Sequence, residues 1–230
     1  MHALDCPVID LLPERERIRL LDRAVPRELA KQQPLFLAGE SAERIYVVTA
    51  GVMKLCARDS SGAETILGLA VEGQLAGDLG ALEGSHPYDG VAATDCSVLA
   101  IDAELFVEIV TGHQTASLEL SRTLAEKWRR MSDVALERTT GEVPVRLAGR
   151  LLDLAELCGR MNSGTIEMQL PLAQEDLGRL AGMCRESACK TLRRFKKAGV
   201  VDYRGRDIRI LRPDVLEKIR CAGRAATPFR

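Results

Sequence analysis

Two kinds of segment are missing from this 230-residue chain. No run approaches the ~20 consecutive apolar residues that a membrane-spanning helix needs. The N-terminus carries Asp5, Asp10 and Glu14 instead of the basic start and apolar run of a signal peptide. Both absences predict a cytoplasmic protein with no membrane partner.

Paired cysteines are missing as well. The chain has seven Cys, an odd number, and no CxxC pair. They are scattered as Cys6, Cys56, Cys96, Cys158, Cys184, Cys189 and Cys221. This spacing excludes a regular disulfide framework and offers no metal site, so we expect free thiols in a reducing compartment.

Charge is unevenly distributed along the chain. Aromatic residues are scarce at 3%, but 46% of the chain is hydrophobic, which suits two ordinary globular domains. The net charge of −1 hides an excess of acids before residue 143 and an excess of bases after it: Val143–Arg230 holds 18 Lys and Arg against 10 Asp and Glu. A basic C-terminal part indicates a polyanionic partner for that part.

Short apolar runs separated by Gly, Asp and Ser fill the stretch from Gln33 to Ile101. This spacing predicts several short strands in a small antiparallel β barrel or roll. The preceding residues, 1–30, are expected to be helical and amphipathic, with Val25 on the buried face.

A long helix is predicted from about Thr115 to Thr139, because no Gly or Pro interrupts it. Side chains at alternating spacings of three and four are typical of a dimer seam, which we assign to Leu124, Trp128, Met131 and Ala135. Packing against the barrel of the same chain is the alternative. Gly141 and Pro144 mark a hinge before the next helix.

Two helices joined by a tight turn and followed by a hairpin are predicted between Leu172 and Leu211. Gly182 ends the first helix, and the second, about Arg185–Ala198, is strongly basic. Ala188, Leu192 and Phe195 are spaced to face the core. Such a helix suits the major groove of double-stranded DNA, although a merely solvated cationic face is the alternative. The residues from about Ala222 onward are expected to fray.

Four segments carry a family resemblance: IYVVTAGVMKL, GDLGALEGSHPYDGVAATDCSVLAI, VPVRLAGRLLDLA and LGRLAGMCRESACKTLRRFKKAGVV. In this order they resemble the cyclic-AMP receptor/fumarate-nitrate-reduction (Crp/Fnr) superfamily. HPYDGVAATDCSVLAI and FKKAGVVDYRGRDIRI are similar to the fumarate-nitrate-reduction branch. The resemblance implies a homodimeric transcription factor whose effector, bound in the barrel, repositions the DNA-binding domains through the long helix. RNA polymerase is a further partner that it implies.

The sequence departs from the family at the effector site. Cyclic-AMP-binding members have a Gly-Glu-Leu turn and an Arg-Ser pair that holds the phosphate. Here the turn is Gly77-Asp78-Leu79, and His86-Pro87-Tyr88-Asp89 stands at the Arg-Ser positions. No Lys or Arg occurs between Arg58 and Arg122, so we expect no cyclic-AMP binding in the usual mode. The candidate effector pocket consists of Gly77, Asp78, Leu79, His86, Tyr88, Met131 and Ser132.

Other sensing chemistries are the alternatives. Cys6, Cys56 and Cys96 are too few and too scattered for the four thiolates of a [4Fe–4S] cluster. We expect no cofactor. Haem held by His86 is one alternative, thiol-based redox sensing through Cys184 or Cys189 is another, and a regulator without an effector is a third. No catalytic site is expected, and the chain is not expected to be an enzyme.

The resemblance and the pairing rules of base edges assign contacts to DNA. Base reading is assigned to Arg185, Glu186, Cys189 and Lys190. Phosphate contacts are assigned to Arg193, Lys196, Lys197, Arg204 and Arg206.

The element pattern and the resemblance together predict an α+β fold: a cyclic-nucleotide-binding-like β-roll (1–114), a dimerisation helix with hinge (115–141) and a winged helix-turn-helix (142–230).

Overall fold

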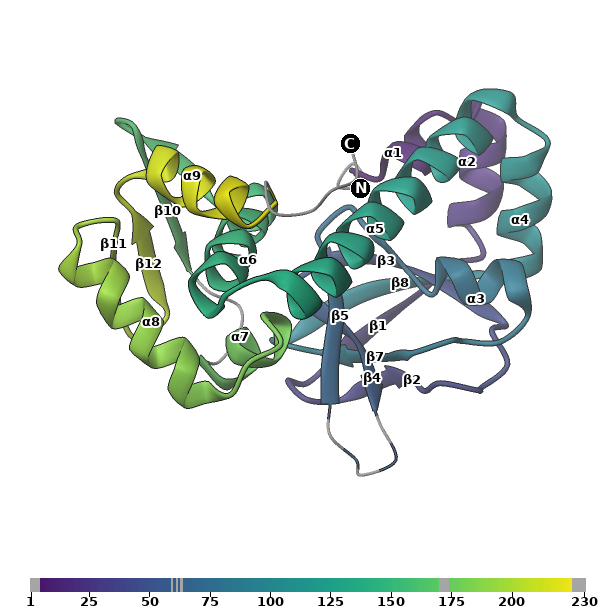
Figure 1. The fold of residues 1–230 in the computed structure, drawn as a ribbon. Helices are drawn as coiled ribbons and strands as arrows, with labels where there is room; N and C mark the ends of the chain where they lie inside the picture. Colours follow the sequence, from purple (N-terminus) through teal and green to yellow (C-terminus); the bar gives the residue numbers. More distant parts are fainter. Residues whose placement is uncertain (1–4, 59, 61, 63, 170–173, 225–230) are drawn as a thin grey trace. The chain divides into compact units, whose positions relative to one another are not determined.

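The computed structural model describes residues 5–58, 60, 62, 64–169 and 174–224. Figure 1 colours the elements in chain order from purple to yellow. The chain divides into two compact units, residues 1–129 and 130–230. The division falls inside one long helix, α5 (Gln114–Thr140), which agrees with the helix predicted for 115–139.

The first unit is built on an antiparallel roll of two four-stranded sheets, ordered β1-β8-β3-β6 and β2-β7-β4-β5. Gly51 makes the turn between the third and fourth strands with a φ of +82°, and a Cβ there would lie 2.3 Å from the Asp95 carbonyl oxygen. The predicted roll is confirmed. Its strands are β1 (Val25–Leu29), β2 (Pro34–Phe36), β3 (Arg44–Ala50), β4 (Val52–Arg58), β5 (Glu64–Val71), β6 (Leu75–Ala76), β7 (Asp89–Ala92) and β8 (Cys96–Asp102).

Strand β1 corrects the expectation of helix over residues 1–30. Helices α1 (Pro7–Asp10) and α2 (Glu14–Leu21) do form there, but Val25–Leu29 pairs with β8 instead. β1 lies at the edge of its sheet, where Pro26 is tolerated because an edge strand can do without one N–H donor. Val25, which we expected to be buried, is 50% exposed. Residues 1–4 lie outside the described chain.

Two apolar cores stabilise the first unit. One fills the roll and includes Val48 and Met53. The other packs the roll against α1, α2, α4 (Ala103–Thr111) and the start of α5, and includes Ile101, Phe106 and Leu120. A short helix, α3 (Asp78–Glu83), follows β6. The N-terminal part of α5 is thus part of the roll's own packing.

The second unit is a winged helix-turn-helix whose sheet has the order β11-β12-β10-β9. Its elements are α6 (Val143–Cys158), β9 (Arg160–Asn162), β10 (Thr165–Gln169), α7 (Gln174–Leu180), α8 (Arg185–Lys197), β11 (Val201–Arg204), β12 (Asp207–Ile210) and α9 (Pro213–Arg224). Pro144 lies in the first turn of α6, as predicted. Residues 170–173, at the predicted start of the first helix of the motif, lie outside the described chain.

The last helix, α9, continues to Arg224. The fraying expected from about Ala222 falls mostly on residues 225–230, which lie outside the described chain, and stays a prediction. The helix packs along α6 and buries Leu216 completely. Its apolar spacing from Val215 to Ile219, after Pro213 at the start, is the signal that predicts it.

Candidate nucleic-acid interface and sensor site

The turn between α7 and α8 is fixed by backbone and side-chain hydrogen bonds. The Met183 N–H donates to the Gly178 carbonyl at 2.9 Å, and Gly182 has a φ of +62°. A Cβ on Gly178 would lie 2.9 Å from the Met183 oxygen, so glycine is needed there. Arg146 of α6 donates to the Gly182 carbonyl at 2.8 Å. The angle between the two helices is therefore held by α6, a role of Arg146 that the sequence did not reveal.

Helix α8 has one apolar and one charged face. Ala188, Thr191, Leu192 and Phe195 are buried, which confirms the predicted core face. At ~100° per residue, the stripe opposite them consists of Glu186, Lys190, Arg193 and Lys197. All four are exposed, and within the described chain none of them has an ion pair. A stripe of unpaired charge directly opposite the core is free to contact a polyanion.

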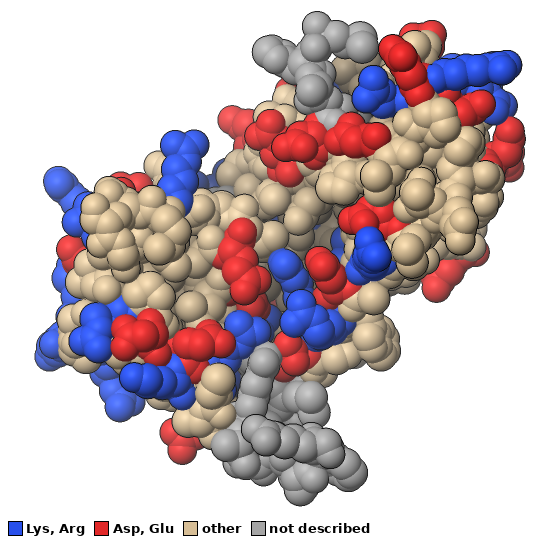
Figure 2. All heavy atoms as spheres, turned by 90° about the horizontal axis from the view of Figure 1, so that it is seen from above, with Lys and Arg blue, Asp and Glu red and all other residues tan. Residues whose placement is uncertain are grey.

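The wing adds two more exposed cations. Strands β11 and β12 pair in register from Val201↔Ile210 to Arg204↔Asp207, and Gly205 makes the turn with a φ of +62°. Arg204 and Arg206 flank this turn and are exposed. Figure 2 shows Lys and Arg side chains gathered along the outer edge of the second unit.

Lys196 differs from the other predicted phosphate contacts because it has partners inside the chain. Its Nζ lies 2.6 Å from Asp202 Oδ1, donates to the Tyr203 carbonyl at 3.1 Å and lies 5.0 Å from the centroid of the Tyr203 ring. The hydrogen bond from Lys196 to the Asp202 carboxylate holds the pKa of Asp202 below its ordinary value. Lys196 connects the recognition helix to the wing.

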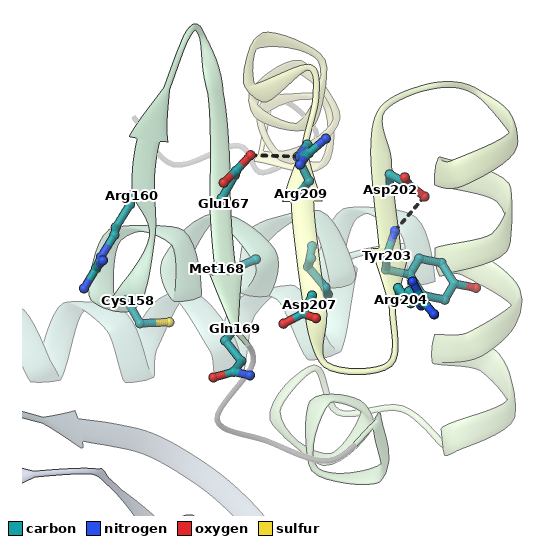
Figure 3. Close-up of a pocket in the computed structure, with 11 residues that line it drawn as sticks. Cys158, Arg160, Glu167, Met168, Gln169, Asp202, Tyr203, Arg204, Asp207 and Arg209 are labelled. Atoms are coloured by element: carbon teal, nitrogen blue, oxygen red, sulfur yellow. Dashed lines mark hydrogen bonds and ion pairs between the residues drawn. The ribbon is translucent and has the colours of Figure 1, made fainter.

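A shallow cavity of about 620 Å³ lies on the wing sheet (Figure 3). Charges of opposite sign alternate across its strands, because Arg160, Glu167, Arg209 and Asp202 are cross-strand neighbours. Arg209 pairs with Glu167 at 3.0 Å. The compensated charges make this face a poor site for a polyanion. Its lining residues are Cys158, Arg160, Glu167, Met168, Gln169, Asp202, Tyr203, Arg204, Asp207, Ile208 and Arg209.

The two redox candidates lie at the start of α8. Cys184 is the N-terminal capping residue and is exposed, and its Sγ lies 3.2 Å from the Ser187 hydroxyl. Hydrogen bonds from the side chain and backbone of Ser187 lower the pKa of this thiol. Cys189 is half-buried. Arg185, the remaining base-reading candidate, is exposed beside Cys184.

In the roll, Asp78 is paired with a lysine that sequence analysis did not assign to the site. Gly77, with a φ of +80°, places Asp78 at the start of α3, where its side chain has no exposed surface. Lys127 of α5 lies 2.5 Å from Asp78 Oδ2 and donates to the Leu75 carbonyl at 2.9 Å. The 49 residues between the two partners explain why no local pattern predicted the pair.

Aromatic rings enclose the other pocket candidates. His86 is 3% exposed and stacks on Phe36 with 4.0 Å between ring centroids. Burial lowers the pKa of His86 and raises that of Tyr88. A Cβ on Gly80 would lie 2.5 Å from His86 Nδ1, so the ring edge is packed against helix α3. This packing does not fit haem ligation by His86.

The remaining candidates take different places. Leu79 packs against the roll's core. Asp89, the last residue of the segment at the family's Arg-Ser positions, accepts a hydrogen bond from the Ala38 N–H at 2.9 Å and lies 3.5 Å from Arg58 Nε. Met131 and Ser132 are half-buried residues of α5 in the second unit. Among the described residues, no three or more His, Cys, Asp or Glu side chains are grouped to hold a metal ion.

The long helix has an exposed row of side chains that shares Trp128 with the predicted seam but contains Ala125 where the seam has Leu124. Leu124 packs against the roll's core, while Trp128 is 72% and Leu118 51% exposed. Ala135 is exposed and Met131 half-buried. The exposed row follows alternating spacings of three and four: Leu118, Ser121, Ala125 and Trp128.

The sequence matches two domain families, the cyclic nucleotide-binding domain over residues 26–113 and the Crp-like helix-turn-helix domain over residues 145–219. In the part that the structure describes, no helix is long and apolar enough to cross a membrane.

Relatives cover most of the chain. It is 25% identical over 186 residues to the CRP-like cAMP-activated global transcriptional regulator of Mycobacterium tuberculosis, covering 80% of this chain and 83% of the relative. It is 25% identical over 226 residues to the fumarate and nitrate reduction regulatory protein of Escherichia coli, covering 95% and 90%.

Solved structures share the fold. FixK2 from Bradyrhizobium japonicum aligns with a TM-score of 0.75 at 22% identity, over 85% of this chain and 96% of that one. A CooA mutant from Carboxydothermus hydrogenoformans aligns with a TM-score of 0.73 at 19% identity, over 87% and 89%. With both domain families present in order, the chain belongs to the Crp/Fnr superfamily of DNA-binding transcription regulators.

Proposed function

We propose that two copies of this chain form a homodimer that reads a palindromic promoter site, each copy placing α8 in the major groove. The exposed stripe of α8 carries this proposal. Glu186 can accept a hydrogen bond from cytosine, and Lys190 can donate to guanine. Arg193, Lys197, Arg204 and Arg206 are placed around these base readers and supply cations for phosphates.

The test is binding of the purified chain to genomic fragments, followed by selection of the preferred sequence from a random pool. A palindromic consensus with half-sites about 10 base pairs apart is the expected result. Retention of every fragment with equal affinity would contradict sequence reading.

Dimerisation is supported by the exposed row on α5. Trp128, largely exposed in the single chain, is the residue most in need of a partner. We expect Trp128→Glu to shift the protein from dimer to monomer in sedimentation velocity. Glu126→Ala, elsewhere on the same helix, is the control. A monomeric wild-type chain at concentrations that saturate DNA would refute the proposal.

The sensor is proposed not to bind cyclic AMP in the usual mode. The family's Arg-Ser positions fall within His86-Pro87-Tyr88-Asp89, which supplies no Lys or Arg for a phosphate, and Asp78 already has Lys127 as its partner. Calorimetric titration with cyclic AMP is expected to show no binding. Saturable binding in the micromolar range would overturn this part.

Control without an effector is a second candidate function for the roll. The Asp78–Lys127 pair favours it, because Lys127 neutralises the carboxylate at the effector turn through Asp78 Oδ2 without any bound molecule. Tight, specific DNA binding by the purified apo-protein would support it.

A thiol-based sensor, favoured by the exposed Cys184, predicts instead that peroxide abolishes DNA binding and that Cys184→Ser or Cys189→Ser prevents this loss. We also propose RNA polymerase as a partner, a cytoplasmic location, and the domain boundaries 1–114 for the roll, 115–141 for the dimerisation helix with hinge and 142–230 for the winged helix-turn-helix.

A further inference from the structure

Lys196 and Lys197 are neighbours on α8 but have different surroundings. Lys197 lies on the stripe opposite the buried face, while Lys196 lies ~100° away, on the flank next to the wing. In Figure 3 the Tyr203 ring points toward α8 and Arg204 follows it on the same strand. Lys196 makes three contacts with the wing: the Asp202 carboxylate, the Tyr203 carbonyl and the Tyr203 ring.

The two strands of the wing are anchored differently: β12 pairs with β10 as far as Asp207↔Gln169, whereas β11 lies at the edge of the sheet and pairs with β12 alone. At the base, the Val200 N–H donates to the Phe195 carbonyl at 2.9 Å, and Val201 and Ile210 are buried. From Arg204 to Asp207, all residues are exposed. Asp202 and Tyr203 lie between these two parts. The contacts of Lys196 are therefore placed where they hold the edge strand β11, which leads to Arg204, against α8.

We propose that Lys196 is a positioning residue: it fixes the wing to the recognition helix and so places Arg204 and Arg206 against the DNA backbone. This inference rests on the proposed DNA binding and specifies the role of the wing in that binding. It replaces a direct phosphate contact by Lys196, whose ammonium already has oxygen partners from two wing residues.

The two roles predict opposite signs for one substitution. If Lys196 were a phosphate contact restrained by Asp202, Asp202→Asn would free the lysine, remove a negative charge and tighten DNA binding. If Lys196 positions the wing, Asp202→Asn loosens the hairpin and weakens binding, by about threefold as for an exposed ion pair. Asp207→Asn is the matched control, because it removes one wing carboxylate that has no ion pair in the described chain, and we expect it to tighten binding slightly.

A double-mutant cycle tests whether Lys196 acts through the wing arginines. Lys196→Met is expected to weaken binding about five- to tenfold in the wild-type background and scarcely at all in Arg204→Met/Arg206→Met, because coupled residues are not additive. Lys196→Arg, which keeps donors for both oxygens, should restore most of the affinity. Equal losses in both backgrounds would show that Lys196 contacts the DNA itself and would overturn the inference.

Hydrogen exchange in the free protein separates this inference from the proposed function. Lys196→Met is expected to accelerate amide exchange in the segment 201–207, and Lys197→Met is not. If the wild-type chain bound no DNA, the proposed function would fail, while exchange would still decide whether Lys196 holds the wing. Unchanged exchange, together with tighter binding by Asp202→Asn, would refute the positioning role.

Discussion

The roll and helix α8 treat their charges in opposite ways. In the roll, charged side chains turn inward and meet a partner: Lys54, 1% exposed, pairs with Glu64 at 2.6 Å, and Asp78 pairs with Lys127. On α8, Glu186, Lys190, Arg193 and Lys197 point outward without an ion pair in the described chain. A buried charge without a partner is costly, whereas an exposed one stays hydrated until a ligand arrives. The roll thus pairs buried charges internally, while the recognition helix leaves its charges free for another molecule.

The largest expected effect comes from breaking the pair in the roll. Lys127→Met leaves the Asp78 carboxylate buried and without its cation, which is expected to lower the free energy of unfolding by about 3 kcal/mol. Urea denaturation measures this loss. Asp78→Asn combined with Lys127→Met should recover part of it, because no uncompensated charge remains.

Lys218→Met, which removes an exposed ion pair in the second unit, is the control for the loss of a buried one. Lys218 is 80% exposed and lies 3.8 Å from Asp214, so its loss is expected to cost less than about 0.5 kcal/mol. If Lys127→Met were equally harmless, the idea that the roll depends on internal charge pairing would be wrong.

The next effect concerns base reading on α8. Glu186→Ala is expected to cost about 1–3 kcal/mol of binding free energy on the preferred site while leaving random DNA nearly unaffected. Fluorescence anisotropy on both DNAs measures the difference. Equal loss on both would show that Glu186 does not read a base.

Phosphate contacts give a smaller and sequence-independent effect. Lys197→Met is expected to lower by about 0.9 the slope of log K against log salt concentration, because one counterion fewer is released from the DNA. The same loss should appear on specific and random DNA. An unchanged slope would show that Lys197 is merely solvated.

Local patterns in the sequence were enough to predict the recognition helix but not the contacts that position it. The core face of α8 follows from the spacing of Ala188, Leu192 and Phe195, because a helix repeats every 3.6 residues. Arg146 meets Gly182 across 36 residues, and Lys127 meets Asp78 across 49, so only the folded chain brings them together. The strand β1 was missed because pairing with β8 outweighs local helical periodicity.

The smallest predicted effect is a pH dependence of the roll. His86 is almost fully buried, and burial lowers its pKa below the ordinary value of 6.5. Below about pH 6.5 the unfolded chain therefore binds a proton that the folded chain does not, so the free energy of unfolding falls as the pH decreases from this value. His86→Gln removes this one-proton contribution, and urea denaturation between about pH 7 and pH 5 should show a shallower fall than in the wild type. Because the charged side chains of α8 do not depend on His86, the DNA affinity of the folded variant should keep the pH dependence of the wild type. Parallel stability profiles for the two proteins would show that the imidazole takes up its proton as readily in the folded roll as in the unfolded chain.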